Sequence, residues 1–92
     1  MNVQAEISLY PLRTDDPGHA IGMFLGKLNA AGLRLQPGKM SSIVAGDADV
    51  VFSTVGRAFK AAVENGQAVL VMKVSNACPS GDTVEGMSAD VG

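Results

Sequence analysis

The hydrophobic periodicity of the chain changes between that of a strand and that of a helix in a fixed order. Apolar and polar residues alternate from Val3 to Leu9, which predicts a strand buried on one face. Pro11 is expected to end this strand, and Asp16 before Pro17 is a typical helix start. The apolar stripe of that helix is Ile21, Phe24, Leu25 and Leu28.

The second half of the chain repeats the change of period. A short strand at residues 33–36, the Pro37-Gly38 turn and a strand from Met40 to Ala45 predict a hairpin. Either Asp47 or Asp49 can cap the helix that follows. Its apolar stripe is Val51, Val55, Phe59 and Ala62. The segment from Ala68 to Ala77 is apolar on both alternating sets, which predicts a central strand.

The element order is therefore strand, helix, strand, strand, helix, strand. Right-handed crossovers in that order give an α+β, ferredoxin-like βαββαβ sandwich, in which a four-stranded antiparallel sheet carries both helices on one face. We expect a single domain over residues 1–92, with a loop-like tail from about residue 80. The other sheet face is left bare, and a chain of 92 residues has a small core, so self-association is expected.

Charge and cysteine content narrow the classes of function. A net charge of −2 and a pI near 5.1 provide no basic stripe for nucleic acid. One cysteine allows no disulfide within the chain, which favours a cytoplasmic protein. The longest apolar runs fall short of the roughly 18 residues of a membrane span, so no membrane insertion is expected.

The reactive side chains do not form a recognisable catalytic set. His19 stands alone in the first turn of a predicted helix, and Cys78 has no identifiable basic neighbour. Metal-ligand spacings and glycine-rich phosphate loops are both missing from the sequence. We expect a protein that is not an enzyme, with no catalytic residues and no bound metal.

The adjacent serines Ser41 and Ser42 are unusual in a strand that buries one face. If Ile43 and Ala45 face the helices, Ser42 points to the bare face; if Met40 and Val44 do, Ser41 points there. A β-bulge would present both hydroxyls. We favour Ser42 and retain both serines as candidates.

Three segments resemble a known family. These are "AEISLYPL" from Ala5, "KMSSIVAGDADVVFSTVGRAF" from Lys39 and "VLVMKVSNACPSGDT" from Val69. Together they resemble the YkoF-like thiamine- and hydroxymethylpyrimidine-binding domain, in the same order and over nearly the whole chain. The resemblance implies a ferredoxin-like fold whose domains pair sheet to sheet, and ligand binding without catalysis. Since this chain has one such domain where others carry two, it implies a homodimer or a dimer of dimers.

The resemblance also implies a set of ligand-binding residues on and around the bare face. They are Ser8, Tyr10, Ser41, Ser42, Met72, Asn76 and Cys78. Short hydroxyls and an amide match the donor and acceptors of an aminopyrimidine, while Tyr10 or Met72 can cover its flat faces. Glu6 or the Tyr10 ring would favour the thiazolium cation.

Two main functions remain open at this stage. The first is a non-catalytic binding protein for thiamine or hydroxymethylpyrimidine in vitamin salvage, with its pocket near a subunit interface and no other cofactor. The alternative is a structural or regulatory oligomerisation module without a ligand. A transporter partner is suggested by analogy alone. The sequence leaves open whether the ligand is thiamine, its phosphate ester, the pyrimidine or another heterocycle.

Overall fold

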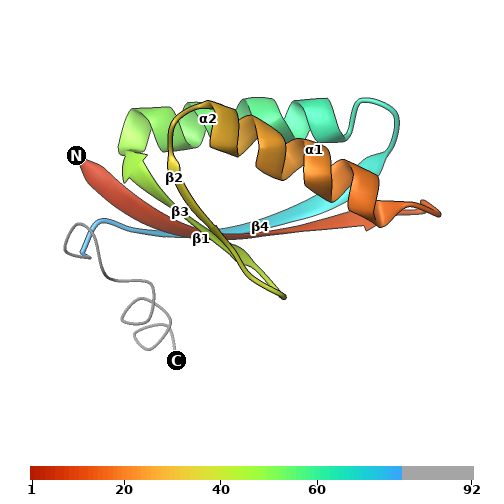
Figure 1. The fold of residues 1–92 in the computed structure, drawn as a ribbon, viewed down its shortest axis with the longest axis horizontal. Helices are drawn as coiled ribbons and strands as arrows, with labels where there is room; N and C mark the ends of the chain where they lie inside the picture. Colours follow the sequence, from red (N-terminus) through yellow and green to blue (C-terminus); the bar gives the residue numbers. More distant parts are fainter. Residues whose placement is uncertain (78–92) are drawn as a thin grey trace.

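The computed structural model describes residues 1–77 as one sheet covered by two helices. The elements are β1 (Asn2–Leu12), α1 (Pro17–Ala30), β2 (Arg34–Pro37), β3 (Ser42–Asp47), α2 (Ala48–Ala62) and β4 (Gln67–Ser75). The strand order is β2-β3-β1-β4, and each neighbouring pair is antiparallel. Both helices lie on the same side of the sheet (Figure 1). The predicted α+β, ferredoxin-like βαββαβ fold is confirmed, while the predicted loop from about residue 80 lies outside the described residues.

Both helices begin at an aspartate that caps the backbone. The Asp16 carboxylate accepts a hydrogen bond of 3.2 Å from the backbone N–H of His19, and Pro17 occupies the first turn. The Asp47 carboxylate accepts a bond of 3.1 Å from the N–H of Asp49. Of the two aspartates that the sequence allowed, Asp47 is therefore the cap of α2, and Asp49 lies in its first turn.

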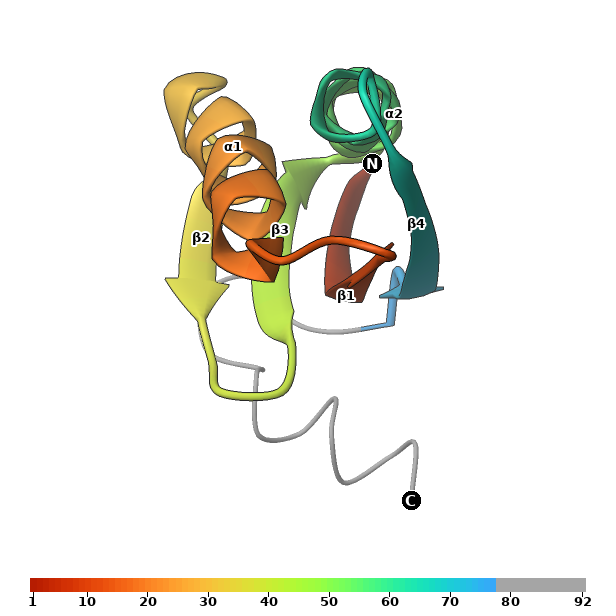
Figure 2. The same cartoon turned by 90° about the vertical axis from the view of Figure 1, so that its right-hand side faces the viewer.

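The core lies between the helices and the sheet, as Figure 2 shows in end view. Its largest fully buried side chains are Phe24 and Leu28 of α1, Val51 of α2, Ile7 of β1 and Val44 of β3. Burying each of these side chains stabilises the fold by about 1.5–3 kcal/mol relative to exposure. One surface of the sheet thus packs against the helices, and neither helix covers the other surface.

The position of β4 differs from the sequence prediction. Among the described residues β4 pairs with β1 alone, so it is an edge strand and the predicted central position is wrong. Leu70 and Met72 pack against the core, but Val69 and Val71 point to the opposite surface with 48% and 45% exposure. The second apolar set, Val69 and Val71, therefore lies on a surface that neither helix covers.

The end of β1 also differs from the prediction. The strand continues through Pro11 to Leu12, and Pro11 is paired with Ala68 of β4. The pairing of β1 with β3 ends at Ile7, so beyond that residue β1 has a neighbour on one side only. Proline, which has no backbone N–H to donate, is tolerated at such a position because the side of β1 without a neighbouring strand needs no donor.

Candidate functional site

The sheet surface turned away from the helices is the candidate site, and we call it the open face. Residues opposite each other in antiparallel strands share a face, so the pairing places Glu6 of β1 beside Ile43 of β3 and Lys73 of β4. The other β1 residues of the open face are Gln4, Ser8 and Tyr10, since side chains alternate along a strand. Figure 1 shows both helices on the other side of the sheet.

Glu6 is at the centre of the polar contacts on this face. Its Oε2 accepts a hydrogen bond of 3.0 Å from Oγ of Ser41, and its Oε1 lies 3.7 Å from Nζ of Lys73. The Glu6 side chain is 27% exposed, whereas Lys73 is half-exposed. The partly buried carboxylate therefore interacts with both the serine hydroxyl and the half-exposed ammonium group of Lys73.

A shallow cavity of about 260 Å³ lies beside Glu6. Ser8 Oγ donates a hydrogen bond of 3.3 Å to the carbonyl of Met40, which fixes the loop before β3 across the strand. The cavity is lined by Glu6, Ser8, Tyr10, Met40, Ser41, Val71 and Lys73. It combines one carboxylate, one ammonium group, two serine hydroxyls, a phenol ring and apolar side chains, and such a mixture of apolar surface with a few polar groups is typical of small-molecule sites. A second cavity of about 300 Å³ at the β2–β3 turn shares Glu6 and Ser41 with it.

Ser8, Tyr10 and Ser41, three of the predicted ligand-binding residues, come together in this cavity. Ser42 does not, because it pairs with Ile7 and is 7% exposed on the helix-facing surface. Val44 packs in the core, which is the arrangement that directs Ser41 to the open face. The favoured orientation of Ser42 is therefore wrong.

Met72 also lies on the helix-facing surface. It is opposite Ile7 in the sheet and packs against the core, so it is not part of the open face. Asn76 follows the end of β4, near Met1, and its Nδ2 lies 3.8 Å from the Met1 sulfur. Along the strands this is five residues from the level of Ser8, on the order of 17 Å. Cys78 lies outside the described residues.

Lys73 and Val71 line the cavity but were not predicted as site residues from the sequence. Both come from β4, whose register against β1 places Val71 opposite Ser8 and Lys73 opposite Glu6. The sequence does contain a signal for the second pair, because Lys73 is the one charged residue in a strand that is otherwise largely apolar. Opposite charges on neighbouring strands favour such a pairing.

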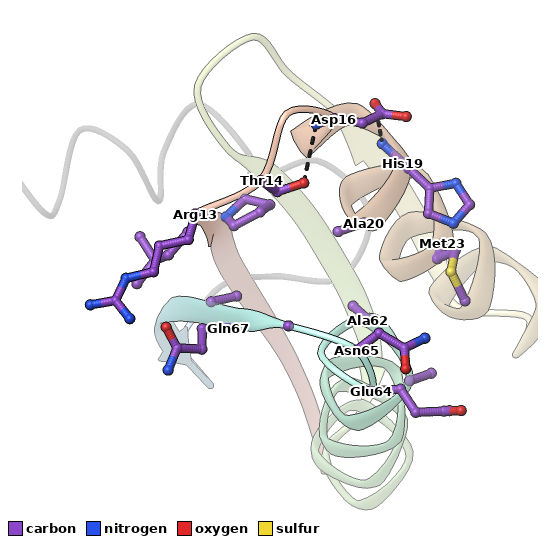
Figure 3. A pocket seen from close by; sticks show the side chains of 15 residues that line it. Arg13, Thr14, Asp16, His19, Ala20, Met23, Ala62, Glu64, Asn65 and Gln67 are labelled. Carbon is purple, nitrogen blue, oxygen red and sulfur yellow. Dashed lines mark hydrogen bonds between the residues drawn. The ribbon is translucent and has the colours of Figure 1, made fainter.

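A separate cavity of about 320 Å³ lies where α1 begins and α2 ends. Figure 3 shows its polar side chains, among them Arg13, Thr14, Asp16 and His19. The hydrogen bonds there belong to the turn and the helix cap: Thr14 Oγ1 accepts from the N–H of Asp16, and Asp16 accepts from the N–H of His19. We therefore assign these contacts to the start of α1 rather than to chemistry at His19.

Residues 1–77 contain neither a metal-binding cluster nor a helix that could span a membrane. Within this range no three His, Cys, Asp or Glu side chains gather closely enough to hold a metal ion. Neither α1 nor α2 is long and apolar enough to cross a bilayer.

The fold and the open face define a class: a small α+β sandwich with two helices on one face and a polar, partly aromatic hollow on the other. The chain belongs to the YKOF-related family, whose model matches residues 2–81. No curated protein has a matching sequence.

Several solved structures share this fold. A domain of unknown function from Bacillus cereus is 24% identical, with a TM-score of 0.77 over 94% of this chain and 86% of that chain. A hypothetical protein from Methanocaldococcus jannascii is 17% identical, with a TM-score of 0.80 over 98% and 95% of the two chains. A Thermotoga maritima protein provisionally assigned to thiamine biosynthesis or salvage is 17% identical, with a TM-score of 0.78 over the full length of both chains. At these identities the likeness is one of fold.

Proposed function

We propose that this protein binds thiamine or its hydroxymethylpyrimidine precursor on the open face, without catalysis, in cytoplasmic vitamin salvage. The observation that carries the proposal is the Glu6 carboxylate, partly buried and held by Ser41 beside the half-exposed ring of Tyr10. Membership of the YKOF-related family supports it, as does the provisional assignment of the Thermotoga maritima protein to thiamine biosynthesis or salvage.

The chemistry of the cavity matches that of thiamine. The thiazolium ring is a cation, which a partly desolvated carboxylate attracts more strongly than one in bulk water. The Tyr10 ring adds a cation–π contact worth about 0.5–2 kcal/mol. Ser8 and Ser41 donate their hydroxyl protons to the Met40 carbonyl and to Glu6, so their oxygens remain able to accept hydrogen bonds from N–H or O–H groups of the ligand.

The proposal includes a second copy of the chain. Tyr10, Val69 and Val71 are exposed together on the open face, where their apolar surface is in water in the single chain. Pairing of two such faces, in a homodimer or a dimer of dimers, would bury these side chains and enclose the shallow cavity. The ligand would then lie between two sheets and be shielded from solvent.

Isothermal titration of the full chain with thiamine, and separately with hydroxymethylpyrimidine, tests the proposal. We expect saturable binding of at least one of them, and we expect Glu6→Gln to weaken thiamine binding by about tenfold through loss of the negative charge. Glu64→Gln, at an exposed position after α2, is the matched control and should bind as the parent does. No heat with either compound from a folded protein would contradict the proposal.

A module for oligomerisation alone is the second candidate function. It is favoured by the same exposed valines, Val69 and Val71, which a mate could cover completely. Under this alternative the protein is a stable oligomer that takes up neither compound. The two functions are therefore separated by the titrations of a protein whose mass in solution is that of an oligomer: saturable binding supports the first function, and no binding supports the second.

A further inference from the structure

Gln4 is a buried polar residue with an unmet hydrogen-bonding requirement. Its side chain is 6% exposed, and its oxygen Oε1 has no hydrogen-bond partner among the described residues. Leaving such an acceptor unpaired costs about 1–3 kcal/mol, and buried polar groups in native proteins are nearly always paired. The position thus requires a donor that residues 1–77 do not supply.

The strand pairing places Gln4 on the open face. Gln4 lies opposite Ala45 of β3 and Ser75 of β4, and it is two residues before Glu6 on the same face of β1. Both of these neighbours have short side chains, and the Gln4 side chain is nevertheless buried. Gln4 was not among the residues that the sequence pattern selected.

A cavity of about 390 Å³ adjoins this residue. It is lined by Gln4, Arg34, Leu35, Gln36, Ile43 and Ala45. This lining combines apolar side chains, among them Ile43 and Ala45, with the amides of Gln4 and Gln36 and with Arg34. Gln36 and Ile43 also line the cavity at the β2–β3 turn, which in turn contains Glu6. The cavities are therefore neighbours along the open face.

We propose that Gln4 recognises the exocyclic amine of an aminopyrimidine ring that lies over Ile43 and Ala45. This inference rests on the proposed function. It specifies which part of the ligand is recognised and which residue recognises it. The amide oxygen accepts from the amine, and the amide nitrogen donates to the adjacent ring nitrogen. Glutamine pairs with adenine through the same arrangement of amine and ring nitrogen. The last torsion of a glutamine side chain is soft, so the amide can turn toward the cavity.

The spacing along β1 agrees with a two-ring ligand. Gln4 and Glu6 are two residues apart on one face, a separation of about 7 Å. Thiamine consists of an aminopyrimidine and a thiazolium ring joined by one methylene carbon. With the pyrimidine at Gln4, the thiazolium cation falls toward the carboxylate of Glu6. The amide of Gln4 then recognises the pyrimidine end of the ligand, and the negative charge of Glu6 attracts the thiazolium end.

The test compares thiamine with oxythiamine, in which an oxygen replaces the exocyclic amine, so that the donor is lost. We expect the parent protein to bind thiamine at least about tenfold more tightly, because oxythiamine leaves the Gln4 oxygen unpaired. Gln4→Leu should bind thiamine more weakly and no longer distinguish the two compounds. Gln67→Leu, at an exposed position at the start of β4, is the control and should keep the full difference.

Loss of folding would not explain that result. Replacing an unpaired buried amide by an apolar side chain of similar size is expected to be neutral or stabilising, which urea unfolding checks. Gln4→Met, with an unbranched side chain, is a second variant with the same expected loss of discrimination. If the parent binds thiamine but Gln4→Leu keeps the preference over oxythiamine, this inference is overturned and the proposed function stands. If the parent binds neither compound, both fail.

Discussion

Ser41 and Glu6 are joined by a hydrogen bond of 3.0 Å between the serine Oγ and the carboxylate Oε2, although they are 35 residues apart in the sequence. Ser41 precedes β3, and Glu6 lies in the middle of β1. The bond therefore holds the end of the β2–β3 turn against the central strand. Ser8 strengthens this connection by donating to the carbonyl of Met40. Two polar contacts thus shape the wall of the candidate cavity.

This relationship predicts opposite outcomes for the two adjacent serines. Ser41→Ala removes a donor to a partly buried carboxylate and should weaken thiamine binding by about fivefold, the equivalent of about 1 kcal/mol. Ser42→Ala, on the helix-facing surface, should leave the affinity unchanged. Titration calorimetry of both variants measures the difference. Weaker binding by Ser42→Ala alone would show that the site lies elsewhere.

Lys73 gives a prediction about charge. Its Nζ lies 3.7 Å from Oε1 of Glu6, where it competes with a bound cation for the same carboxylate. Lys73→Gln should therefore bind the cation thiamine more tightly, by about 0.2–1 kcal/mol, with little change for the uncharged hydroxymethylpyrimidine. The gain should shrink as salt is raised from 0.01 to about 0.5 M, because the pair is half-exposed. An equal gain for both ligands would contradict a role of charge.

The exposed valines of β4 predict how copies of the chain associate. Val71 lies opposite Ser8 on the open face and is 45% exposed. If two open faces pack together, Val71→Lys places a charge in the interface and should shift the protein toward the monomer in sedimentation experiments. Phe52→Lys, on an exposed part of α2, is the matched control and should leave the oligomer intact. Dissociation by Phe52→Lys instead would place the interface on the helices.

The sequence was sufficient for the order of the elements because their signals are local. Asp16, Pro17 and Asp47 act on the backbone within three residues, and the apolar periods are complete within each segment. The helix-facing assignment of Ile7 and Leu9 follows from the same local alternation. The sequence therefore predicted correctly which β1 residues lie on the open face, including Ser8 and Tyr10.

The remaining errors concern relationships between strands. The choice between Ser41 and Ser42 depends on the register of β3 against β1. The sequence alone is compatible with either serine on the open face. The position of β4 at the edge depends on strand order, and an edge strand that is apolar on both faces has the same sequence pattern as a central strand. Gln4 was overlooked because the burial of a polar side chain depends on its neighbours across the sheet rather than on its own segment.

Replacing either of two glycines near the end of α1 by alanine should change the free energy of unfolding, in opposite directions for the two positions. Gly32 has a φ of +79°, in the left-handed region, so Gly32→Ala should lower the free energy of unfolding by about 1–2 kcal/mol. Gly26 lies within α1, and an added Cβ there meets no atom within 4 Å. Gly26→Ala should therefore raise the free energy of unfolding by about 0.5–1 kcal/mol. Urea unfolding of both variants at one protein concentration measures these changes, and a destabilised Gly26→Ala would mean that another surface packs closely on this face of α1.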